Sequence, residues 1–381
     1  MADNKAPAFS AIIKQADLIS VMGRVNNVVE KRNTIPILGY AKIEAKEGRV
    51  YFTASDLDIE IRDSIEPNEL DIDGSIAVPA GVLYDIARKM PKGSDIQLIS
   101  REHRIEISTG RSNFNLPTLP PENFPVMSKD DFQNDFRISC DAFKTIIDRT
   151  KFAMSTEETR YYLNGLYLVG QDGGDYGMLR AVATDGHRLA LSQIDAPDGA
   201  QGMGGVIVPR KTVLEIRRLM ETFPKDEDIQ VKVSSNKIQF TIGDMVLTSK
   251  LIDGTFPDYD RVIPKNNEKI MTVDGKVFVK AIDRVATIAE GKTRSIVFDI
   301  SKDNLCVKTT TSEFGSGQEE ISVKYQDEDF QIGFNAKYLV DTIAQIESDK
   351  AEFHMDGPAS PMLIKDPDTP GSLFVLMPLR V

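Results

Sequence analysis

The stretch Thr184-Asp185-Gly186-His187-Arg188-Leu189 follows an apolar strand pattern, and Val206-Ile207-Val208-Pro209 and a helical pattern come after it. The same order occurs earlier, where Phe52-Thr53-Ala54-Ser55-Asp56-Leu57 is followed by Ser75-Ile76-Ala77-Val78-Pro79 and another helical pattern. Asp56 and Asp185 are 129 positions apart, and the two prolines are 130 apart. Solenoid units recur every ~20–50 residues, so this longer period predicts repeated domains.

A third, more diverged repeat fills the rest of the 381 residues, with Phe334-Asn335-Ala336 where the earlier repeats have Val-Pro. Phe124-Pro125 and Phe256-Pro257, 132 positions apart, mark the two linkers. We therefore predict three domains, at residues 1–132, 133–264 and 265–381.

Each repeat contains two half-units, and each half-unit is a helical pattern followed by strands. Leu18, Val21, Met22, Val25 and Val29 have helical spacing, which predicts an amphipathic helix from Phe9 to Glu30. Period-2 alternation predicts half-buried strands. We expect an α+β fold with two helices per domain on antiparallel sheets. The expected helices span residues 10–30, 79–90, 140–154, 209–222, 275–290 and 336–348, and the expected strands span 49–53, 59–61, 96–99, 104–108, 229–233 and 238–242.

Composition indicates the compartment. Cys140 and Cys306 lie in separate repeats and form no disulfide framework, which favours a reducing cytoplasm. The polar start of the chain has no apolar signal core, and no apolar run approaches the ~18 residues of a membrane span. We expect a cytoplasmic protein without a membrane partner.

The net charge of −12 is unevenly distributed. The six expected helices hold 15 Lys and Arg against 11 Asp and Glu, whereas the rest of the chain holds 31 against 47. Helix surfaces often carry Lys and Arg for solubility alone. The alternative is a basic helical layer on an acidic body, which a nucleic-acid backbone would fit.

Catalytic motifs are not evident in the sequence. His103, His187 and His354 fall one per repeat, which disfavours a shared metal site. The Gly199–Gly205 loop lacks the strand-loop-helix context of a dinucleotide site, and Asp56 and Asp185 have the positions of turn formers. The tail Val375-Leu376-Met377-Pro378-Leu379 is too apolar for a frayed end, so we expect it to pack on the protein or to frame a groove.

The chain resembles the bacterial DNA polymerase III beta subunit, or sliding clamp, family along its whole length. The matching segments occur in order through all three repeats. They are Thr34-Ile35-Pro36-Ile37-Leu38-Gly39, Arg160-Tyr161-Tyr162-Leu163-Asn164-Gly165, Ala183-Thr184-Asp185-Gly186-His187-Arg188-Leu189-Ala190, Val206-Ile207-Val208-Pro209-Arg210-Lys211, Phe256-Pro257-Asp258-Tyr259 and Val375-Leu376-Met377-Pro378-Leu379-Arg380. The resemblance implies three domains of one topology and two chains joined head to tail in a ring, with helices lining the hole.

The function that the resemblance implies is that of a processivity factor and not of an enzyme. Such a ring encircles duplex DNA without reading its sequence and slides along it. It tethers the polymerase III alpha subunit, the clamp loader, other DNA polymerases and repair factors through short peptide motifs. The implied assembly is a homodimer without cofactor or metal.

The resemblance also assigns residues. The implied DNA contacts are Arg32, Tyr161 and Tyr162, with the helix cations Arg24, Lys144, Arg149, Arg210 and Lys211. The implied partner-peptide groove consists of Leu163, Thr184, Gly186, His187, Arg188, Leu189, Pro257, Arg261, Val262, Val375, Met377, Pro378, Leu379 and Arg380. The implied dimer interface places Phe114 of one chain against Thr287 and Ile288 of the other.

Departures from the family pattern are small. They are an N-terminal extension at residues 1–8, apparent insertions at Gly173-Gly174 and Gly199–Gly205, and Leu376 and Leu379 within the tail motif. Leu379 is expected to affect which partner peptides bind best. Two other classes remain open from the residues alone: an acidic repeat-built scaffold that binds only proteins, and a small-molecule enzyme with its site near Asp185 and His187.

Overall fold

The computed structural model describes residues 9–30, 34–128, 130–171, 177–289, 291 and 294–380. The predicted DNA contact Arg32, the N-terminal extension and the Gly173-Gly174 insertion lie outside these residues. Contacts between residues divide the chain into two compact units, Met1–Cys140 with Leu214–Leu251 and Asp141–Val213 with Ile252–Val381.

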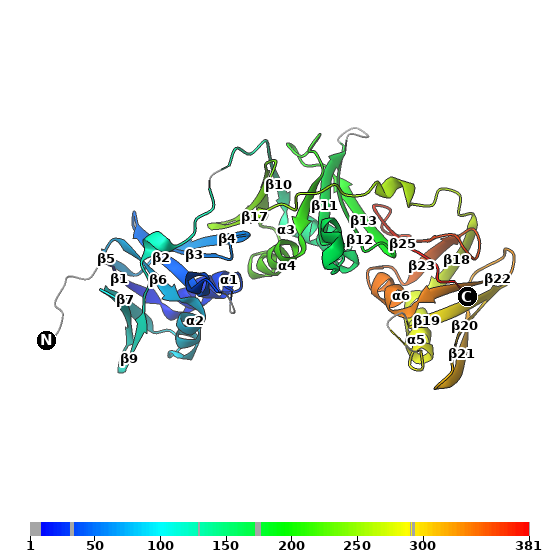
Figure 1. Ribbon diagram of the computed structural model, residues 1–381, viewed down its shortest axis with the longest axis horizontal. Coiled ribbons are helices and arrows are strands. Elements are labelled where there is room, and N and C mark those ends of the chain that lie inside the picture. The colour runs from blue at the N-terminus through cyan, green and yellow to red at the C-terminus, as the bar shows by residue number, and fades with distance from the viewer. Residues whose placement is uncertain are drawn as a thin grey trace. The chain divides into compact units, whose positions relative to one another are not determined.

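The first unit contains two antiparallel sheets (Figure 1). The five-stranded sheet runs, in spatial order, β5 (Glu69–Ile72), β1 (Ser10–Lys14), β7 (Asp95–Arg101), β8 (Arg104–Thr109) and β9 (Ser112–Pro117). The eight-stranded sheet runs β10 (Asn134–Ser139), β15 (Asp228–Val233), β16 (Lys237–Ile242), β17 (Met245–Lys250), β4 (Ile59–Ile65), β3 (Arg49–Ser55), β2 (Tyr40–Lys46) and β6 (Gly74–Pro79). All six strands predicted from alternation are confirmed, and they lie within β3, β4, β7, β8, β15 and β16.

Two helices of the first unit, α1 (Gln15–Val25) and α2 (Ala80–Lys89), pack on each other and bury their apolar stripes. Pro79 immediately precedes α2. Proline has no backbone N–H, but at this position the helix requires no hydrogen bond from one. The predicted helix from Phe9 was wrong in its first turn and a half, because residues 10–14 form β1. Phe9, Ala11 and Ile13 are fully buried at period 2, and this alternation outweighs the helical spacing that begins at Leu18.

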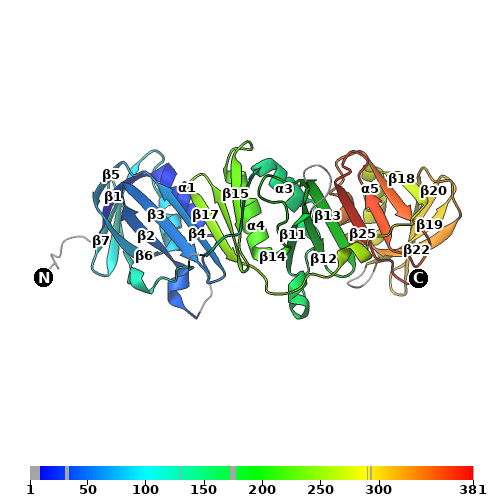
Figure 2. The ribbon, with the colours of Figure 1, turned by 90° about the horizontal axis from the view of Figure 1, so that it is seen from above.

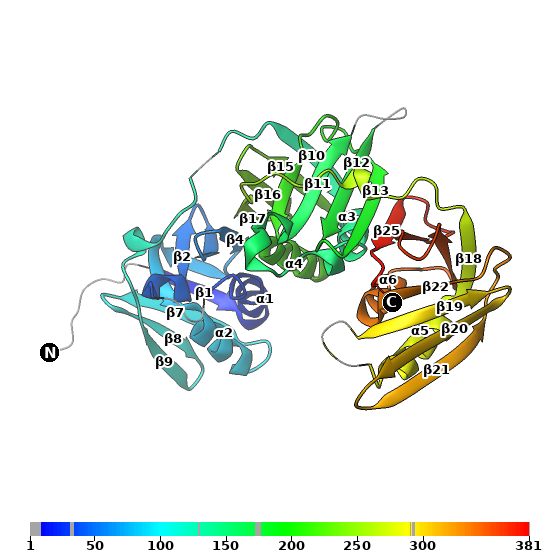
Figure 3. The ribbon, with the colours of Figure 1, turned by 45° about the vertical axis from the view of Figure 1, so that its right-hand side comes forward.

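The second unit also contains two antiparallel sheets (Figure 2). The eight-stranded sheet runs β14 (Val206–Pro209), β11 (Gly165–Gln171), β12 (Met178–Thr184), β13 (Arg188–Asp195), β25 (Ser372–Leu376), β24 (Met362–Lys365), β23 (Lys350–Met355) and β18 (Lys269–Asp274). The four-stranded sheet, which is seen well in Figure 3, runs β21 (Gly315–Ser322), β20 (Asn304–Thr311), β19 (Ser295–Ser301) and β22 (Phe330–Asn335).

Helices α5 (Gly275–Ala286) and α6 (Ala336–Ile343) belong to the second unit and contact each other. Asp274 and Asn335 cap their N-termini by accepting backbone N–H bonds. Helices α3 (Cys140–Asp148) and α4 (Arg210–Leu219) span the division between the units. The predicted helix at 140–154 was too long, since a separate 3-10 turn follows at Lys151–Ala153. No helix in the described ranges combines the length and the apolar character needed to cross a membrane.

Both eight-stranded sheets continue across a predicted domain boundary. Strand β17 pairs with β4, and β25 pairs with β13, so strands more than 170 positions apart lie side by side. We name the β4–β17 junction the first joint and the β13–β25 junction the second joint. The division at residues 132 and 264 remains a prediction, and these joints lie where the predicted domains would meet.

Candidate functional site

The turn between β12 and β13 is built by Asp185. Its Oδ1 accepts backbone N–H bonds from His187 (2.9 Å) and Arg188 (3.0 Å), and Thr184 Oγ1 donates to the Arg188 carbonyl (2.7 Å). Gly186 has a φ of 87°, and a Cβ there would lie 2.5 Å from Arg160 Nη1. Asp185 is therefore a turn former, and glycine is needed beside it.

The apolar tail is an ordered part of the sheet. Strand β25 lies between β13 and β24, with Leu189 opposite Val375. Beyond the strand, Met377 N–H donates to the His187 carbonyl (2.9 Å), and Leu379 N–H donates to the Gly333 carbonyl (2.8 Å). The tail consequently packs on the protein, as its composition required.

An apolar pocket of about 230 Å³ opens at the second joint. It stands on a buried cluster that includes Leu163, Leu189 and Val375. Nine of the residues predicted for the partner groove line it: Leu163, Thr184, Gly186, Arg188, Leu189, Pro257, Val262, Val375 and Met377. Met377 and Val262 remain 39% and 41% exposed, so apolar surface is accessible at the mouth.

Tyr259 also lines this pocket and was not among the predicted groove residues. It begins the 3-10 helix Tyr259–Arg261 in the segment that follows β17. Its ring packs beside Phe256 and Tyr167, which stack on each other with centroids 4.7 Å apart. Tyr259 closes the matching segment Phe256-Pro257-Asp258-Tyr259, which was the available signal for it.

Other predicted groove residues lie outside the lining of the pocket. Arg261 is exposed and pairs with Asp258 at 2.7 Å. Pro378 and Leu379 are half-buried and Arg380 is exposed beyond the end of β25. The His187 ring stacks on Tyr338, with centroids 6.4 Å apart. These residues are adjacent to the apolar pocket in the chain but do not form its wall.

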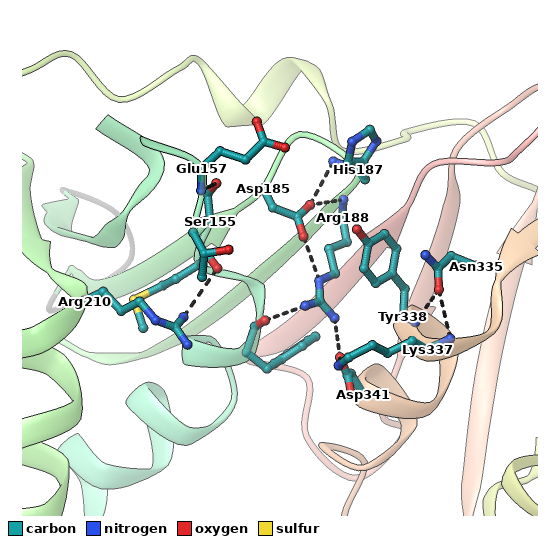
Figure 4. A pocket seen from close by; sticks show the side chains of 13 residues that line it. Ser155, Glu157, Asp185, His187, Arg188, Arg210, Asn335, Lys337, Tyr338 and Asp341 are labelled. Atoms are coloured by element: carbon teal, nitrogen blue, oxygen red, sulfur yellow. Dashed lines mark hydrogen bonds and ion pairs between the residues drawn. The ribbon is translucent and has the colours of Figure 1, made fainter. Parts of the chain in front are cut away.

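His187 instead lines a second, polar cavity of about 530 Å³ (Figure 4). The cavity lies among the β12–β13 turn, the segment at residues 152–157 and the start of α6. Its lining consists of Phe152, Met154, Ser155, Thr156, Glu157, Asp185, His187, Arg188, Arg210, Asn335, Lys337, Tyr338 and Asp341. Burial raises the pKa of the Tyr338 phenol, which keeps that side chain uncharged.

Arg188 separates the two cavities and is 9% exposed. Its guanidinium pairs with Asp185 (3.0 Å) and Asp341 (2.8 Å), donates to the Phe152 carbonyl (2.7 Å), and lies 4.4 Å from the Tyr338 ring centroid (Figure 4). These partners satisfy the charge inside the protein. Arg188 therefore joins the wall of the pocket to α6, and its charge is not offered to a ligand.

The predicted DNA contacts differ in exposure. Arg149 is 8% exposed, donates to Ser372 and pairs with Glu347 at 2.7 Å, so its guanidinium is bonded within the protein and is the least exposed of these residues. Arg24 is partly buried and pairs with Asp63. Tyr161 is 54% exposed and Lys211 is exposed, whereas three others are partly buried: Tyr162, Lys144 and Arg210.

The predicted interface residues occupy sheet edges or lie against them. Phe114 lies on β9, at one edge of the five-stranded sheet, and is 41% exposed. Ile288 follows α5 and lies against Gly317 of β21, the edge strand of the four-stranded sheet. Thr287 is exposed beside it. Among the described residues, no three His, Cys, Asp or Glu side chains gather in a way that would hold a metal ion.

Antiparallel sheets that continue across joints, with pairs of short helices in each repeat, define the DNA-clamp class of α+β proteins. Models of the DNA polymerase III beta subunit match the chain three times: the N-terminal domain at residues 9–128, the central domain at 137–258 and the C-terminal domain at 260–380. The chain therefore belongs to the DNA polymerase III beta subunit family, the beta sliding clamps. Its function is that of a processivity factor for DNA polymerase.

Individual relatives agree with this membership. The chain is 49% identical to the beta sliding clamp of Caulobacter vibrioides over 97% of its own length and 99% of the relative, and 34% identical to that of Pseudomonas aeruginosa with the same coverage. A solved Caulobacter crescentus pol III beta structure superposes with a TM-score of 0.94 at 49% identity, covering 98% of this chain and all of that one. A Bartonella birtlesii sliding clamp bound to griselimycin has a TM-score of 0.94 at 42% identity, with the same coverage.

Proposed function

We propose that the apolar pocket at the second joint binds a short apolar motif of partner proteins. The proposed partners are the polymerase III alpha subunit, the clamp loader, other DNA polymerases and repair factors. The observation that carries this proposal is the pocket itself, an accessible apolar hollow walled by the chain's own tail. Two or three apolar side chains would bury a few hundred Å² there, on the order of 5–8 kcal/mol before the costs of association, so we expect binding weak enough for partners to exchange.

Griselimycin is a further proposed ligand of the same pocket. The solved Bartonella birtlesii clamp is bound to this compound, and that clamp is 42% identical to the present chain. Binding at the second joint would make griselimycin a probe for the proposed partner site.

The helices would supply the DNA-facing layer. As observed, α1 to α6 contain 12 Lys and Arg against 7 Asp and Glu, and α4 alone has four cations against one acid. The proposed contacts are Tyr161, Tyr162, Lys144, Arg210 and Lys211, together with Arg24 and with Arg32 outside the described residues. Phosphate contacts of this kind carry no sequence information, so the protein can slide along duplex DNA.

Two edge strands support the proposed head-to-tail dimer. Among the described strands, β9 and β21 each end a sheet, so one side of each pairs with no other described strand. Pairing β9 of one chain with β21 of a second chain would continue the sheet and would bring Phe114 toward Thr287 and Ile288. A contact between different surfaces that closes after two chains gives a ring.

The protein so described needs neither a catalytic residue nor a cofactor. Its proposed role is mechanical, since encircled DNA is held by topology while weak contacts permit movement. The expected cytoplasmic location is consistent with this proposal, because a protein that encircles bacterial DNA would act in that compartment.

Topological retention tests this function. Loaded by its clamp loader onto nicked circular DNA, the protein should remain bound in moderate salt and should be lost rapidly once the circle is linearised. A scaffold that binds only proteins would be retained on neither substrate. Equal retention on circular DNA and on linear DNA with free ends would contradict encirclement.

A further inference from the structure

Tyr259 forms a wall of the apolar pocket, yet no strand carries it. It lies in a short 3-10 turn, where the Val262 N–H donates to its carbonyl (3.0 Å). Tyr259 is 7% exposed, and its ring meets Phe256 and Tyr167 at tilted or edge-on angles. These contacts pack the sides of the ring, and the hydroxyl at its far end needs polar partners.

The hydroxyl group fixes that far end. Arg180 Nη1 and Gln171 Nε2 each donate to the Tyr259 hydroxyl oxygen at 3.1 Å. Arg180 is itself oriented, since its Nε donates to Gln193 Oε1 at 2.9 Å across the β12–β13 pair. Its side chain is 17% exposed, and Asp260 lies 3.7 Å away. A hydrogen bond from a partly buried guanidinium is stronger and more directional than one between neutral groups.

The polar residues that hold the Tyr259 hydroxyl lie outside the pocket. Leu189, Leu191 and Gln193 are every second residue of β13, so their side chains lie on the same face of the sheet. On the neighbouring strand β12, Val182 lies opposite Leu191 and Arg180 lies opposite Gln193. Leu189 lines the pocket, whereas Arg180, Gln171 and Gln193 do not. This face is therefore apolar at Leu189, where it lines the pocket, and polar at Gln193 and Arg180. Tyr259 contacts both regions, since it lines the pocket and its hydroxyl accepts a hydrogen bond from Arg180.

We propose that Arg180 and Gln171 are positioning residues that hold the Tyr259 ring and thereby set the size of the apolar side chain that the pocket accepts. The proposal rests on the proposed binding of partner motifs at this pocket. A ring held at both ends cannot move aside for a bulkier side chain, so the pocket selects by size. Releasing the hydroxyl allows the ring to tilt and relaxes that selection.

Three synthetic peptides test the proposal. Each has the same serine and glutamine flanks around a central pair of Leu-Leu, Phe-Phe or Ala-Ala, and binding to the full-length protein is measured by fluorescence anisotropy. For the native protein we expect the Phe-Phe peptide to bind at least about tenfold more weakly than the Leu-Leu peptide, because a well-packed pocket penalises oversized groups. For Arg180→Gln and Tyr259→Phe this ratio should fall below about threefold.

Two controls separate positioning from general destabilisation. Arg180→Lys keeps a cation but not the planar fork, and it should restore part of the selectivity. Arg137→Gln removes an exposed arginine of β10 that does not line the pocket, and it should behave as the native protein. All variants should keep the native oligomeric mass and should remain folded at the assay temperature, although Tyr259→Phe and Arg180→Gln lose a hydrogen bond and should melt somewhat lower.

The outcomes distinguish a failure of the partner pocket from a failure of the positioning role. If the native protein binds none of the three peptides, the proposed partner pocket is wrong. If the native protein binds them selectively and Arg180→Gln and Tyr259→Phe keep the native ratio, or weaken all three peptides equally, the positioning role is wrong. Loss of selectivity with the Leu-Leu affinity retained supports it.

Discussion

The first and second joints are built on one plan, and only the second carries the described apolar pocket. In each joint an Asx turn, at Asp56 or Asp185, leads into a strand that pairs with the last strand of another predicted domain. Lys250 N–H donates to the Asp58 carbonyl at 2.9 Å, and Met377 N–H donates to the His187 carbonyl at the same distance. The backbone is therefore equivalent at both joints.

The side chains at equivalent positions differ. Leu189, Val375 and Met377 of the second joint correspond to Glu60, Thr248 and Lys250 of the first. Polar groups thus replace the apolar floor and wall of the pocket.

The linker segments differ too. At the first joint the Met127 N–H donates to Glu60 Oε2 (2.9 Å), and Lys237 Nζ donates to the Ser128 carbonyl (2.9 Å), so the chain's own linker lies against the strand. At the second joint the corresponding segment contributes Pro257, Tyr259 and Val262 to the lining of an open hollow. The shared backbone fold does not by itself make an apolar pocket. The pocket requires apolar side chains and a linker that leaves them accessible.

The largest expected effect is on ligand affinity, when Leu189 of the second joint is replaced by the glutamate that stands at the corresponding position of the first joint, Glu60. Leu189→Glu should weaken griselimycin binding at least about 100-fold, because a charge would have to be buried without a partner in an apolar pocket. Isothermal titration measures it, and Glu60→Leu is the matched control that should bind normally. Unaltered affinity in Leu189→Glu would place the ligand elsewhere.

The next effect concerns Arg188, whose counterpart in the first joint is the buried Ile59. Arg188→Ala should cost about 1.5–3 kcal/mol of stability, because Asp185 and the Phe152 carbonyl lose a charged donor, whereas Asp341 keeps its ion pair with Lys337. The double variant Arg188→Met with Asp341→Leu replaces the ion pair with apolar side chains and should recover more than half of this loss. Urea unfolding measures both, and a native-like midpoint for Arg188→Ala would show that the network contributes little.

A smaller effect concerns the turns. Gly186 and Leu57 occupy equivalent positions with φ of 87° and 80°, a region in which side chains are strained. Gly186→Ala should destabilise by about 1 kcal/mol, whereas Leu57→Gly should stabilise by less than about 1 kcal/mol. Melting temperatures measure the pair, and shifts of the same sign would contradict the equivalence of the two turns.

The smallest effect depends on pH. Burial raises the pKa of Glu60 above its ordinary value, so the folded state favours the protonated acid and loses that preference as pH rises through the folded-state pKa. Glu60→Gln keeps an acceptor for Met127 and should match the native protein at low pH. At neutral pH it should be more stable, by less than about 1 kcal/mol once solvent screening is included. An advantage that grows toward acid pH would have the wrong sign.

Much of this could be predicted from the sequence, and the failures have physical causes. The repeat, the helices after Pro79 and Pro209 and the nine pocket residues follow from local patterns and the resemblance. The roles of Arg188 and Arg149 could not, because their partners Asp341 and Ser372 lie 153 and 223 positions away. Tyr259 was missed because its role depends on how the linker folds back on the sheet.

Native mass spectrometry with excess griselimycin determines whether the second joint of each chain binds this ligand and the first does not. We expect a species of two chains with two bound ligands, and no bound ligand after residues 377–381 are deleted. Four ligands per two chains would mean that both joints bind, and two ligands retained on the deleted protein would mean that the tail-walled pocket is not the site.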